Sequence, residues 1–518
     1  MADIRKDQER DELHRAIWAI ADGLRGSVDG WDFKSYVLGM MFYRYISENL
    51  TNYINEGEIE AGNEGFDYAL LSDEDAEQAR EDMVKTKGFF ILPSELFCNL
   101  RKKAAGDENL NMTLETIFKN IEDSAKGSES EDNFAGLFDD IDVNSNKLGA
   151  TVAKRNANLV KLIEGVADMK LGNYKDNSID AFGDAYEYLM SMYASNAGKS
   201  GGEFFTPQEV SELLTRIAVV GKTEVNKVSA PACGSGSLLL KAAKILGKEN
   251  VRQGFYGQEI NLTTYNLCRI NMFLHDIDYD KFDIAHEDTL LNPQHWDDEP
   301  FEVIVSNPPY SIKWEGDDNP VLINDPRFSP AGVLAPKSKA DLAFIMHSLS
   351  WLATNGTAAI VCFPGGAEKK IRQYLIDNNF IDCIIQLPSN LFFGTTIATC
   401  IMVLKRSKAD NRTLFIDATN ECVKVTNNNK LTDGPDGNIA HIVDAFVSRA
   451  DKEHFARCVP YEEIVEQDYN LSVSSYVEQE DTREEIDIVK LNKEIEEIVA
   501  REQVLRAEIA KIIAELEG

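Results

Sequence analysis

The stretch KVSAPACGSGSLLLKAAKILG, residues 227–247, decides the fold class. It opens with a short apolar run typical of a buried strand and closes with leucines at helical spacing. Gly234 and Gly236 lie between these two parts, where they allow the chain to turn tightly and to approach a ligand closely. The stretch therefore predicts a strand, a glycine-rich turn and a helix that begins near Ser237.

The same alternation continues through the following 160 residues or so. Helical patterns separate further apolar runs, and each run predicts a strand: GFYGQEI (254–260), KFDIAH (281–286), FEVIVSNPP (301–309), TAAIVCFP (357–364), IDCIIQLP (381–388) and ATCIMVLKR (398–406). Strands that alternate with helices predict an α/β fold with a mostly parallel, seven-stranded sheet and helices on both faces. In such sheets, ligands bind at the carboxyl ends of the strands.

The two ends of the chain have a different pattern of apolar residues. Residues 1–170 carry apolar side chains at helical spacing, as in DELHRAIWAIADGLRG (11–26), and predict an all-helical N-terminal domain. Residues 171–478 are expected to form the α/β domain, and residues 479–518 a C-terminal helix. Its apolar residues follow a four-three spacing typical of a coiled-coil seam: Leu491, Ile495, Ile498, Leu505, Ile509, Ile512 and Leu516. This helix either docks to a partner helix or packs on its own domain, and the strict seam favours docking.

Composition limits the class of protein. The chain has 518 residues, 43% of them hydrophobic, and no apolar run of membrane-spanning length. Its charged N-terminus lacks the apolar core of a signal peptide, and its eight cysteines show neither CxxC pairs nor zinc-ligand spacing. We therefore expect a cytoplasmic protein with reduced cysteines and no metal site. The net charge of −34 opposes binding to nucleic acid. If the protein acts on DNA, another chain would have to supply much of the affinity for DNA.

The segment SNPPY, residues 306–310, ends one of the predicted strands in an unusual way. Pro308 and Pro309 have no N–H and cannot continue a central strand, and Asn307 before them is kept out of helical geometry. The Asn307 amide oxygen and the Pro308 carbonyl can both accept hydrogen bonds from one planar amino group. Tyr310 offers a stacking face for the ring that carries this group. The segment thus predicts a site that makes an amino group more nucleophilic, and no strong base is needed if the donor is a sulfonium.

Two carboxylates follow the next strands in the same way. Glu259 comes about 25 residues after Gly234, near the spacing expected for an acid that binds ribose hydroxyls. Its simpler interpretation is a surface carboxylate beside a helix start. Asp288 follows the third strand and either accepts a hydrogen bond from an adenine amino group or caps a helix. The glycine loop itself is not the dinucleotide fingerprint, because Ser237 and Leu238 replace its third glycine.

These motifs resemble the S-adenosylmethionine-dependent amino-methyltransferases in which the glycine loop precedes NPPY, as in the gamma-order DNA adenine methyltransferases. Over nearly its full length, the chain resembles the modification subunit of a type I restriction-modification system. The further segments that carry this resemblance are GKSGGEFFTPQEV, DAYEYLM, LAPKSKADLAFIMH and DYNLSVSSYV. The resemblance implies methyl transfer to the exocyclic amino group of adenine, with the adenine flipped out of the duplex.

The resemblance also assigns roles to residues and partners to the chain. Asn307, Pro308, Pro309 and Tyr310 would hold the adenine. S-adenosylmethionine would lie against Glu203, Phe204, Phe205, Thr206, Pro207, Gln208, Ser235, Gly236, Ser237, Glu259 and Asp288. Target reading on double-stranded DNA would come from a specificity subunit, typically one for two modification subunits, and a restriction subunit could join the complex.

The chain departs from the family pattern at two places. Ala230 stands where the family usually has an acid before Pro231, and CFPGGAEKKIR, residues 362–372, looks shorter than its counterpart. These departures keep an inactive modification-subunit scaffold open as an alternative. Protein glutamine methyltransferases also use NPPY and form the second alternative, but a helical domain and a terminal seam are excessive for them.

Overall fold

The computed structural model describes residues 2–24, 30–170, 188–189, 206–296, 299–363, 368–392, 398–425, 428–479 and 488–517. The chain divides into two compact units, Met1–Val477 and Glu478–Gly518. Among the helices that the structure describes, none is long and apolar enough to cross a membrane.

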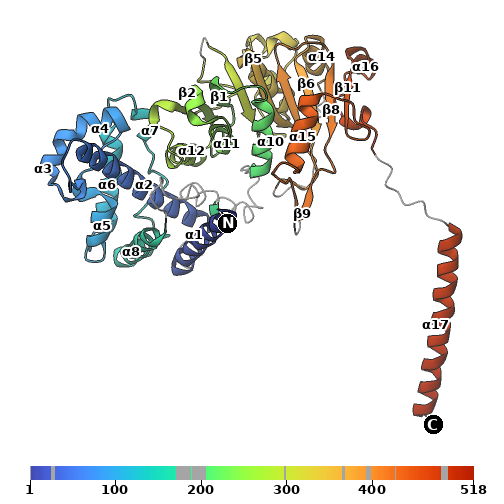
Figure 1. Ribbon diagram of the computed structural model, residues 1–518, viewed down its shortest axis with the longest axis horizontal. Helices are drawn as coiled ribbons and strands as arrows, with labels where there is room; N and C mark the ends of the chain where they lie inside the picture. Colours follow the sequence, from blue (N-terminus) through green and yellow to red (C-terminus); the bar gives the residue numbers. More distant parts are fainter. Residues whose placement is uncertain are drawn as a thin grey trace. The chain divides into compact units, whose positions relative to one another are not determined.

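The described residues up to position 170 form helices joined by turns, as the sequence predicts (Figure 1). The central helix of this region is α2, Gly30–Glu60. Its side chains Leu38, Met41 and Phe42 are completely buried against the rest of the protein. Thr151 caps α8 by accepting a hydrogen bond from the Lys154 N–H. The elements are α1 (Ala2–Leu24), α2, η1 (Tyr68–Leu70), α3 (Asp73–Ala76), η2 (Glu77–Ala79), α4 (Arg80–Lys87), η3 (Pro93–Glu95), α5 (Phe97–Ala104), α6 (Leu110–Ser124), α7 (Glu131–Phe134) and α8 (Val152–Asp168).

The main sheet has nine strands within the described residues, in the order β11-β8-β6-β7-β5-β4-β1-β2-β3. All pairs are parallel except those of β7 with β5 and β6, and of β11 with β8. The strands are β1 (Val225–Ala230), β2 (Val251–Glu259), β3 (Phe282–His286), β4 (Phe301–Ser306), β5 (Leu352–Cys362), β6 (Ile381–Gln386), β7 (Cys400–Lys405), β8 (Thr413–Asp417) and β11 (Ala456–Val459). A separate hairpin pairs β9 (Val423–Val425) with β10 (Asn428–Lys430).

The expected strand number of seven needs a correction. All seven predicted strands, β1 to β7, form adjacent positions of the sheet, and β8 and β11 extend it beyond β6. β11 escaped prediction because it is a four-residue edge strand, too short to show a period of its own. β8 is as long as β3 and fully buried, so its apolar run TLFID was a usable signal that the prediction missed. The mostly parallel α/β fold is otherwise confirmed.

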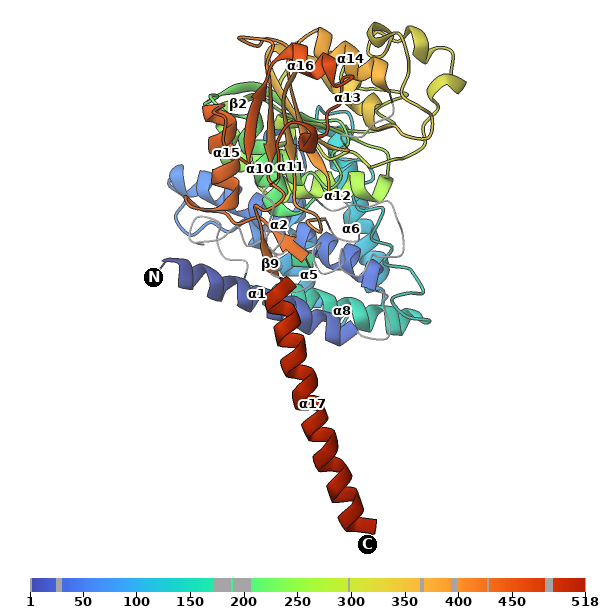
Figure 2. The same ribbon diagram turned by 90° about the vertical axis from the view of Figure 1, so that its right-hand side faces the viewer.

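Helices cover both faces of the sheet (Figure 2). Neighbouring residues of one strand belong to different cores: Val303 and Val305 lie in the core that includes α10, α11 and α15, whereas Ile304 lies in the core that includes α13 and α14. This alternation follows from the two-residue period of a strand. The helices are α10 (Gln208–Ala218), α11 (Ser237–Leu246), η4 (Lys248–Asn250), α12 (Leu262–Leu274), η5 (Tyr279–Lys281), η6 (Gly316–Asp318), η7 (Leu322–Asn324), η8 (Ser329–Ala331), α13 (Asp341–Trp351), α14 (Lys369–Asp377), α15 (Asn438–Ser448), α16 (Tyr461–Glu466) and η9 (Val473–Ser475).

The second unit contains one long helix, α17, Ile488–Glu517. Its seam residues from Ile495 to Ile512 are exposed, with Ile498 at 67% and Ile512 at 56%. The off-seam Val499, Val504 and Ile513 are exposed as well. Within the second unit, nothing among the described residues therefore covers these apolar side chains of α17.

Candidate active site

The sheet order places the predicted site segments side by side. Strands β4, β1, β2 and β3 are neighbours and run parallel, so their carboxyl ends share one edge. Along this edge follow Asn307 after β4, the glycine loop after β1, Glu259 at the end of β2 and Asp288 after β3. These residues are spread over about eighty positions of the sequence, and sheet topology alone makes them neighbours.

Asn307 is held on both sides of its amide. Its Nδ2 donates a hydrogen bond of 2.9 Å to Thr206 Oγ1, and its Oδ1 accepts one from the Tyr310 hydroxyl. Burial raises the pKa of the Tyr310 phenol well above its usual value, so the hydroxyl remains a donor. The amide therefore has a defined orientation, with its oxygen on the side of Tyr310.

Aromatic rings surround Tyr310. The Phe363 ring centroid lies 4.9 Å from the Tyr310 centroid in an edge-on arrangement, and that of Phe392 lies 6.1 Å away. Neither phenylalanine was predicted from the sequence. Phe363 had a usable signal, since it directly follows the strand next to β4 at the same edge. Phe392 had none, because its position in a long loop does not indicate what it contacts.

The two glycines of the loop are required for different reasons. Gly236 has φ = +84°, and a Cβ there would lie 2.8 Å from both Cys268 Sγ and Met272 Cε of α12. Gly234 has φ = +56°, and a Cβ there would point into open space. The loop is therefore packed against α12 on one side and is bare on the other. Asn271 also donates a 2.8 Å hydrogen bond to the Ser235 carbonyl, a support that the sequence analysis did not foresee.

Glu259 braces the loop as well as lining the edge. Its Oε2 accepts a 3.1 Å hydrogen bond from the Gly234 N–H, and its Oε1 accepts one of 2.9 Å from the Asn261 N–H. Each carboxylate oxygen has a second lone pair. The carboxylate therefore lies beside a helix start and contacts the glycine loop, and its binding to ribose hydroxyls stays a prediction.

Asp288 caps the turn that follows β3. Its Oδ1 accepts hydrogen bonds from the N–H groups of Leu290 and Leu291, at 2.8 and 3.2 Å. Arg327, only 1% exposed, holds the same turn by donating to the carbonyl oxygens of Thr289 and Leu290. Residues 288–291 form a turn and no helix, so Asp288 caps a turn and not the expected helix start. A hydrogen bond from an adenine amino group to Asp288 stays a prediction.

Comparison with known proteins decides the family. A family model described as N-6 DNA methylase matches residues 177–485, and one described as the HsdM N-terminal domain matches residues 13–166. The methylase subunit of a type I restriction enzyme from Mycoplasma pneumoniae is 49% identical over 99% of this chain and 97% of its own length. The chain belongs to the N-6 DNA methylase family.

Further matches agree with this assignment. A type I methylase subunit from Methanocaldococcus jannaschii is 30% identical over 99% of this chain and 85% of its own length. The crystal structure of a type I restriction-modification methyltransferase subunit from Streptococcus thermophilus matches with a TM-score of 0.80 at 35% identity, covering 90% of this chain and 99% of that one. These matches confirm the predicted family and the predicted function as an adenine-specific DNA methylase subunit of a type I system.

Part of the predicted site of this N-6 DNA methylase cannot be placed. Glu203, Phe204 and Phe205 lie outside the described residues, as does most of the short loop, at positions 364–367. The remainder of the first segment is placed: Thr206 contacts Asn307, Pro207 caps α10, and Gln208 begins that helix. A segment that precedes the sheet in the sequence, at the start of α10, therefore contributes to the site.

Ala230, the departure from the family pattern, ends β1 and is completely buried. It pairs in register with Gly257 of β2, beneath the glycine loop. A methyl group at this position fills the sheet without needing a polar partner. In this methylase, the support of the loop therefore comes from Glu259 and Asn271 and not from an acid at the end of β1.

Proposed function

We propose that this chain transfers a methyl group from S-adenosylmethionine to the N6 amino group of an adenine that has been flipped out of double-stranded DNA. The observation that carries the proposal is the Asn307 amide, oriented by Thr206 and Tyr310 at the strand end next to the glycine loop. Residues 171–478 would carry out this chemistry, residues 1–170 would support it, and residues 479–518 would serve assembly.

The part of the site that would hold the target adenine would act by accepting hydrogen bonds. The Asn307 Oδ1 and the Pro308 carbonyl oxygen would each accept a hydrogen bond from the adenine amino group, which directs its nitrogen lone pair out of ring conjugation. The Tyr310 hydroxyl now bound to Oδ1 occupies one lone pair of that oxygen and leaves the second for the base. Tyr310, Phe363 and Phe392 form an aromatic cluster against which a planar base can stack.

The cofactor side fits S-adenosylmethionine in the chemistry of its groups. The bare side of Gly234 leaves room for a ligand, and the start of α11 offers backbone N–H groups. The Glu259 carboxylate can accept hydrogen bonds from two vicinal ribose hydroxyls, and Asp288 Oδ2 from an adenine amino group. When bound there, the cofactor supplies a methyl group on a cationic sulfur with a neutral leaving group.

We further propose that the chain works in a complex with a specificity subunit, two modification subunits to one, and that it can recruit a restriction subunit. The net charge of −34 supports a partner that supplies the contacts to phosphate. The exposed seam of α17 supports a helical partner, because a free stripe of isoleucine and leucine favours aggregation.

A methylation assay tests the proposal. The full chain, alone and with its specificity subunit, is incubated with labelled S-adenosylmethionine and duplex DNA, and N6-methyladenine is measured. We expect product only with both subunits. Calorimetry of the chain with S-adenosylmethionine separates an enzyme from an inactive scaffold, which would bind none. Label in a glutamine-containing protein and none in DNA would instead support the protein glutamine methyltransferase.

A further inference from the structure

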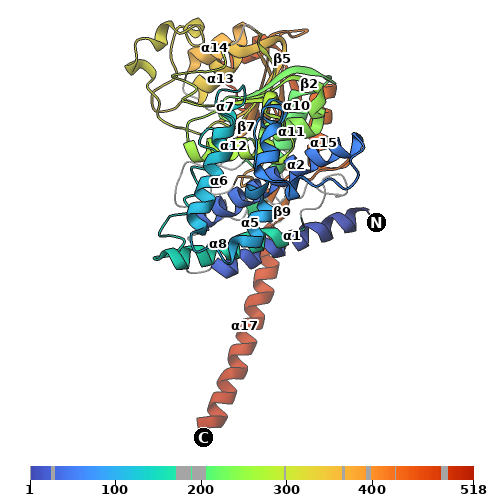
Figure 3. The same cartoon turned by 90° about the vertical axis from the view of Figure 1, so that its left-hand side faces the viewer.

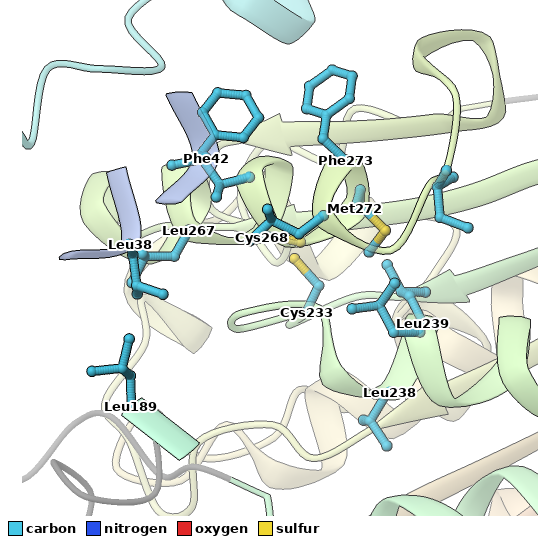
Figure 4. Packing of buried hydrophobic residues seen from close by; sticks show 14 of the residues in the cluster. Leu38, Phe42, Leu189, Cys233, Leu238, Leu239, Leu267, Cys268, Met272 and Phe273 are labelled. Atoms are coloured by element: carbon cyan, nitrogen blue, oxygen red, sulfur yellow. The ribbon is translucent and has the colours of Figure 1, made fainter. Parts of the chain in front are cut away.

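Helix α12 carries the glycine loop on one face (Figure 4). Cys268 points toward Cys233 of the loop, and the Sγ of Cys268 and the Cε of Met272 define how closely Gly236 can approach. Asn271, on the same face, donates to the Ser235 carbonyl. The position of the loop therefore depends on the position of α12.

The opposite face of α12 is inserted into the N-terminal helical region (Figures 3 and 4). Phe273 lies beside Phe42 of α2, with ring centroids 5.8 Å apart. The Arg269 Nη1 donates hydrogen bonds to the carbonyl oxygens of Asp132 and Ala135, at 2.8 and 2.9 Å. Arg269 is only 1% exposed, so these carbonyls take the place of water around its charge.

The first turn of α12 makes a second connection to the same region. Asp140 accepts hydrogen bonds from Thr263 Oγ1 and Asn266 Nδ2, each 2.8 Å long and each on a different carboxylate oxygen. Asn266 in turn accepts a 2.6 Å hydrogen bond from Arg269 Nη2. The side chains of the helix thus aim the guanidinium at the backbone of residues 132–135, and a carboxylate of the N-terminal region holds them in place.

We propose that α12 couples the docking of the N-terminal helical region to cofactor binding, with Arg269 and Asp140 as positioning residues. A helix moves largely as one body, so loss of the contacts to residues 132–140 shifts Cys268, Asn271 and Met272 beneath the loop. Because such coupling is reciprocal, cofactor binding must also stabilise the docked N-terminal region. The inference rests on the proposed binding of S-adenosylmethionine at this loop.

The test compares Asp140→Ala with Asp139→Ala in the full chain. Both variants remove one carboxylate from the same segment, but only Asp140 accepts hydrogen bonds from α12, whereas the exposed Asp139 acts on Arg269 through its charge alone. Calorimetry with S-adenosylmethionine should show a dissociation constant about fivefold higher for Asp140→Ala, or about 1 kcal/mol, at unchanged stoichiometry. Asp139→Ala should bind like the original chain. Arg269→Met should weaken binding at least as much as Asp140→Ala. If Arg269→Met does not fold, Asp140→Ala alone is sufficient for the test.

Hydrogen exchange supplies the reciprocal measurement. Addition of S-adenosylmethionine should slow amide exchange in peptides covering residues 131–141 of the original chain and should do so less in Asp140→Ala. The coupling is overturned if Asp140→Ala binds with unchanged affinity, or if the cofactor leaves exchange at 131–141 unaltered. If the original chain binds no S-adenosylmethionine at all, the proposed function is wrong. Failure of the proposed function can therefore be distinguished from failure of the coupling, in which the original chain still binds the cofactor.

Discussion

Asn307 makes its two contacts with different segments, Thr206 before the sheet and Tyr310 three residues further on. We predict that Asn307→Ala lowers the rate of methyl transfer at least about 100-fold, or about 2.7 kcal/mol, because its oxygen binds the amino group most tightly in the transition state. Binding of S-adenosylmethionine should stay nearly intact. Single-turnover assays with the specificity subunit, together with calorimetry, measure both quantities.

A matched control for this variant is Asn319→Ala. Asn319 is partly exposed, and its side chain donates to Glu315 and accepts from the Val321 N–H, with no contact to Asn307 among its hydrogen bonds. Its replacement should change neither rate nor affinity. Loss of cofactor affinity in Asn307→Ala, with normal methylation at saturating cofactor, would show that the assigned role is wrong.

Glu259 combines two functions in one carboxylate, since it would bind ribose and already holds the Gly234 N–H. Glu259→Ala should weaken S-adenosylmethionine binding at least about tenfold, or 1.4 kcal/mol, through loss of charge-assisted hydrogen bonds. Glu224→Ala is the control, because this exposed carboxylate pairs with Arg252 at the other end of the sheet. An unchanged dissociation constant for Glu259→Ala would place the ribose elsewhere.

Ala230 allows a test of the departure from the family pattern. Ala230→Asp places a carboxylate at a position with no exposed surface, so the cofactor-free protein should have a lower melting temperature. If the acid can orient the cofactor's ammonium group, S-adenosylmethionine should raise the melting temperature of the variant more than that of the original chain. An equal or smaller rise would indicate that the loop has adapted to alanine.

At the scale of elements, the role of α17 can be tested separately from cofactor binding, because this helix belongs to its own compact unit. Removal of residues 485–518 should leave S-adenosylmethionine binding unchanged and abolish assembly with the specificity subunit, as measured by size-exclusion chromatography. A finer version replaces Ile498, Leu505 and Ile512 of the seam with glutamine. The control replaces Val499, Val504 and Ile513, which are comparably exposed but lie off the seam. A complex of normal size after truncation would refute docking through α17.

At the scale of the whole molecule, charge determines how the chain reaches DNA. With a net charge of −34, the chain alone should bind duplex DNA more weakly than a typical non-specific binder, whose dissociation constant is about 10⁻⁴–10⁻⁶ M. Fluorescence anisotropy at about 150 mM salt should show tight binding only after the specificity subunit is added. Binding by the isolated chain below about 1 μM would mean that a basic surface of its own suffices.

Much of the candidate site could be predicted because its signals are local. Pro308 and Pro309 restrict the backbone wherever they occur, and the glycines of residues 234 and 236 mark a turn between a strand and a helix. The seven apolar runs report burial through their own periodicity. The edge strand β11 had too few residues for such a signal.

Contacts between distant segments depended on the tertiary structure. The sequence by itself determined the α/β alternation, the strand ends that carry Asn307, Glu259 and Asp288, and the helical character of both termini. Only the tertiary structure decided that Thr206 orients Asn307, that Phe363 and Phe392 surround Tyr310, and that Arg269 joins α12 to the N-terminal region. The physical reason is that periodicity and backbone restriction act over a few residues, whereas these contacts follow from which elements become neighbours when the sheet and helices pack.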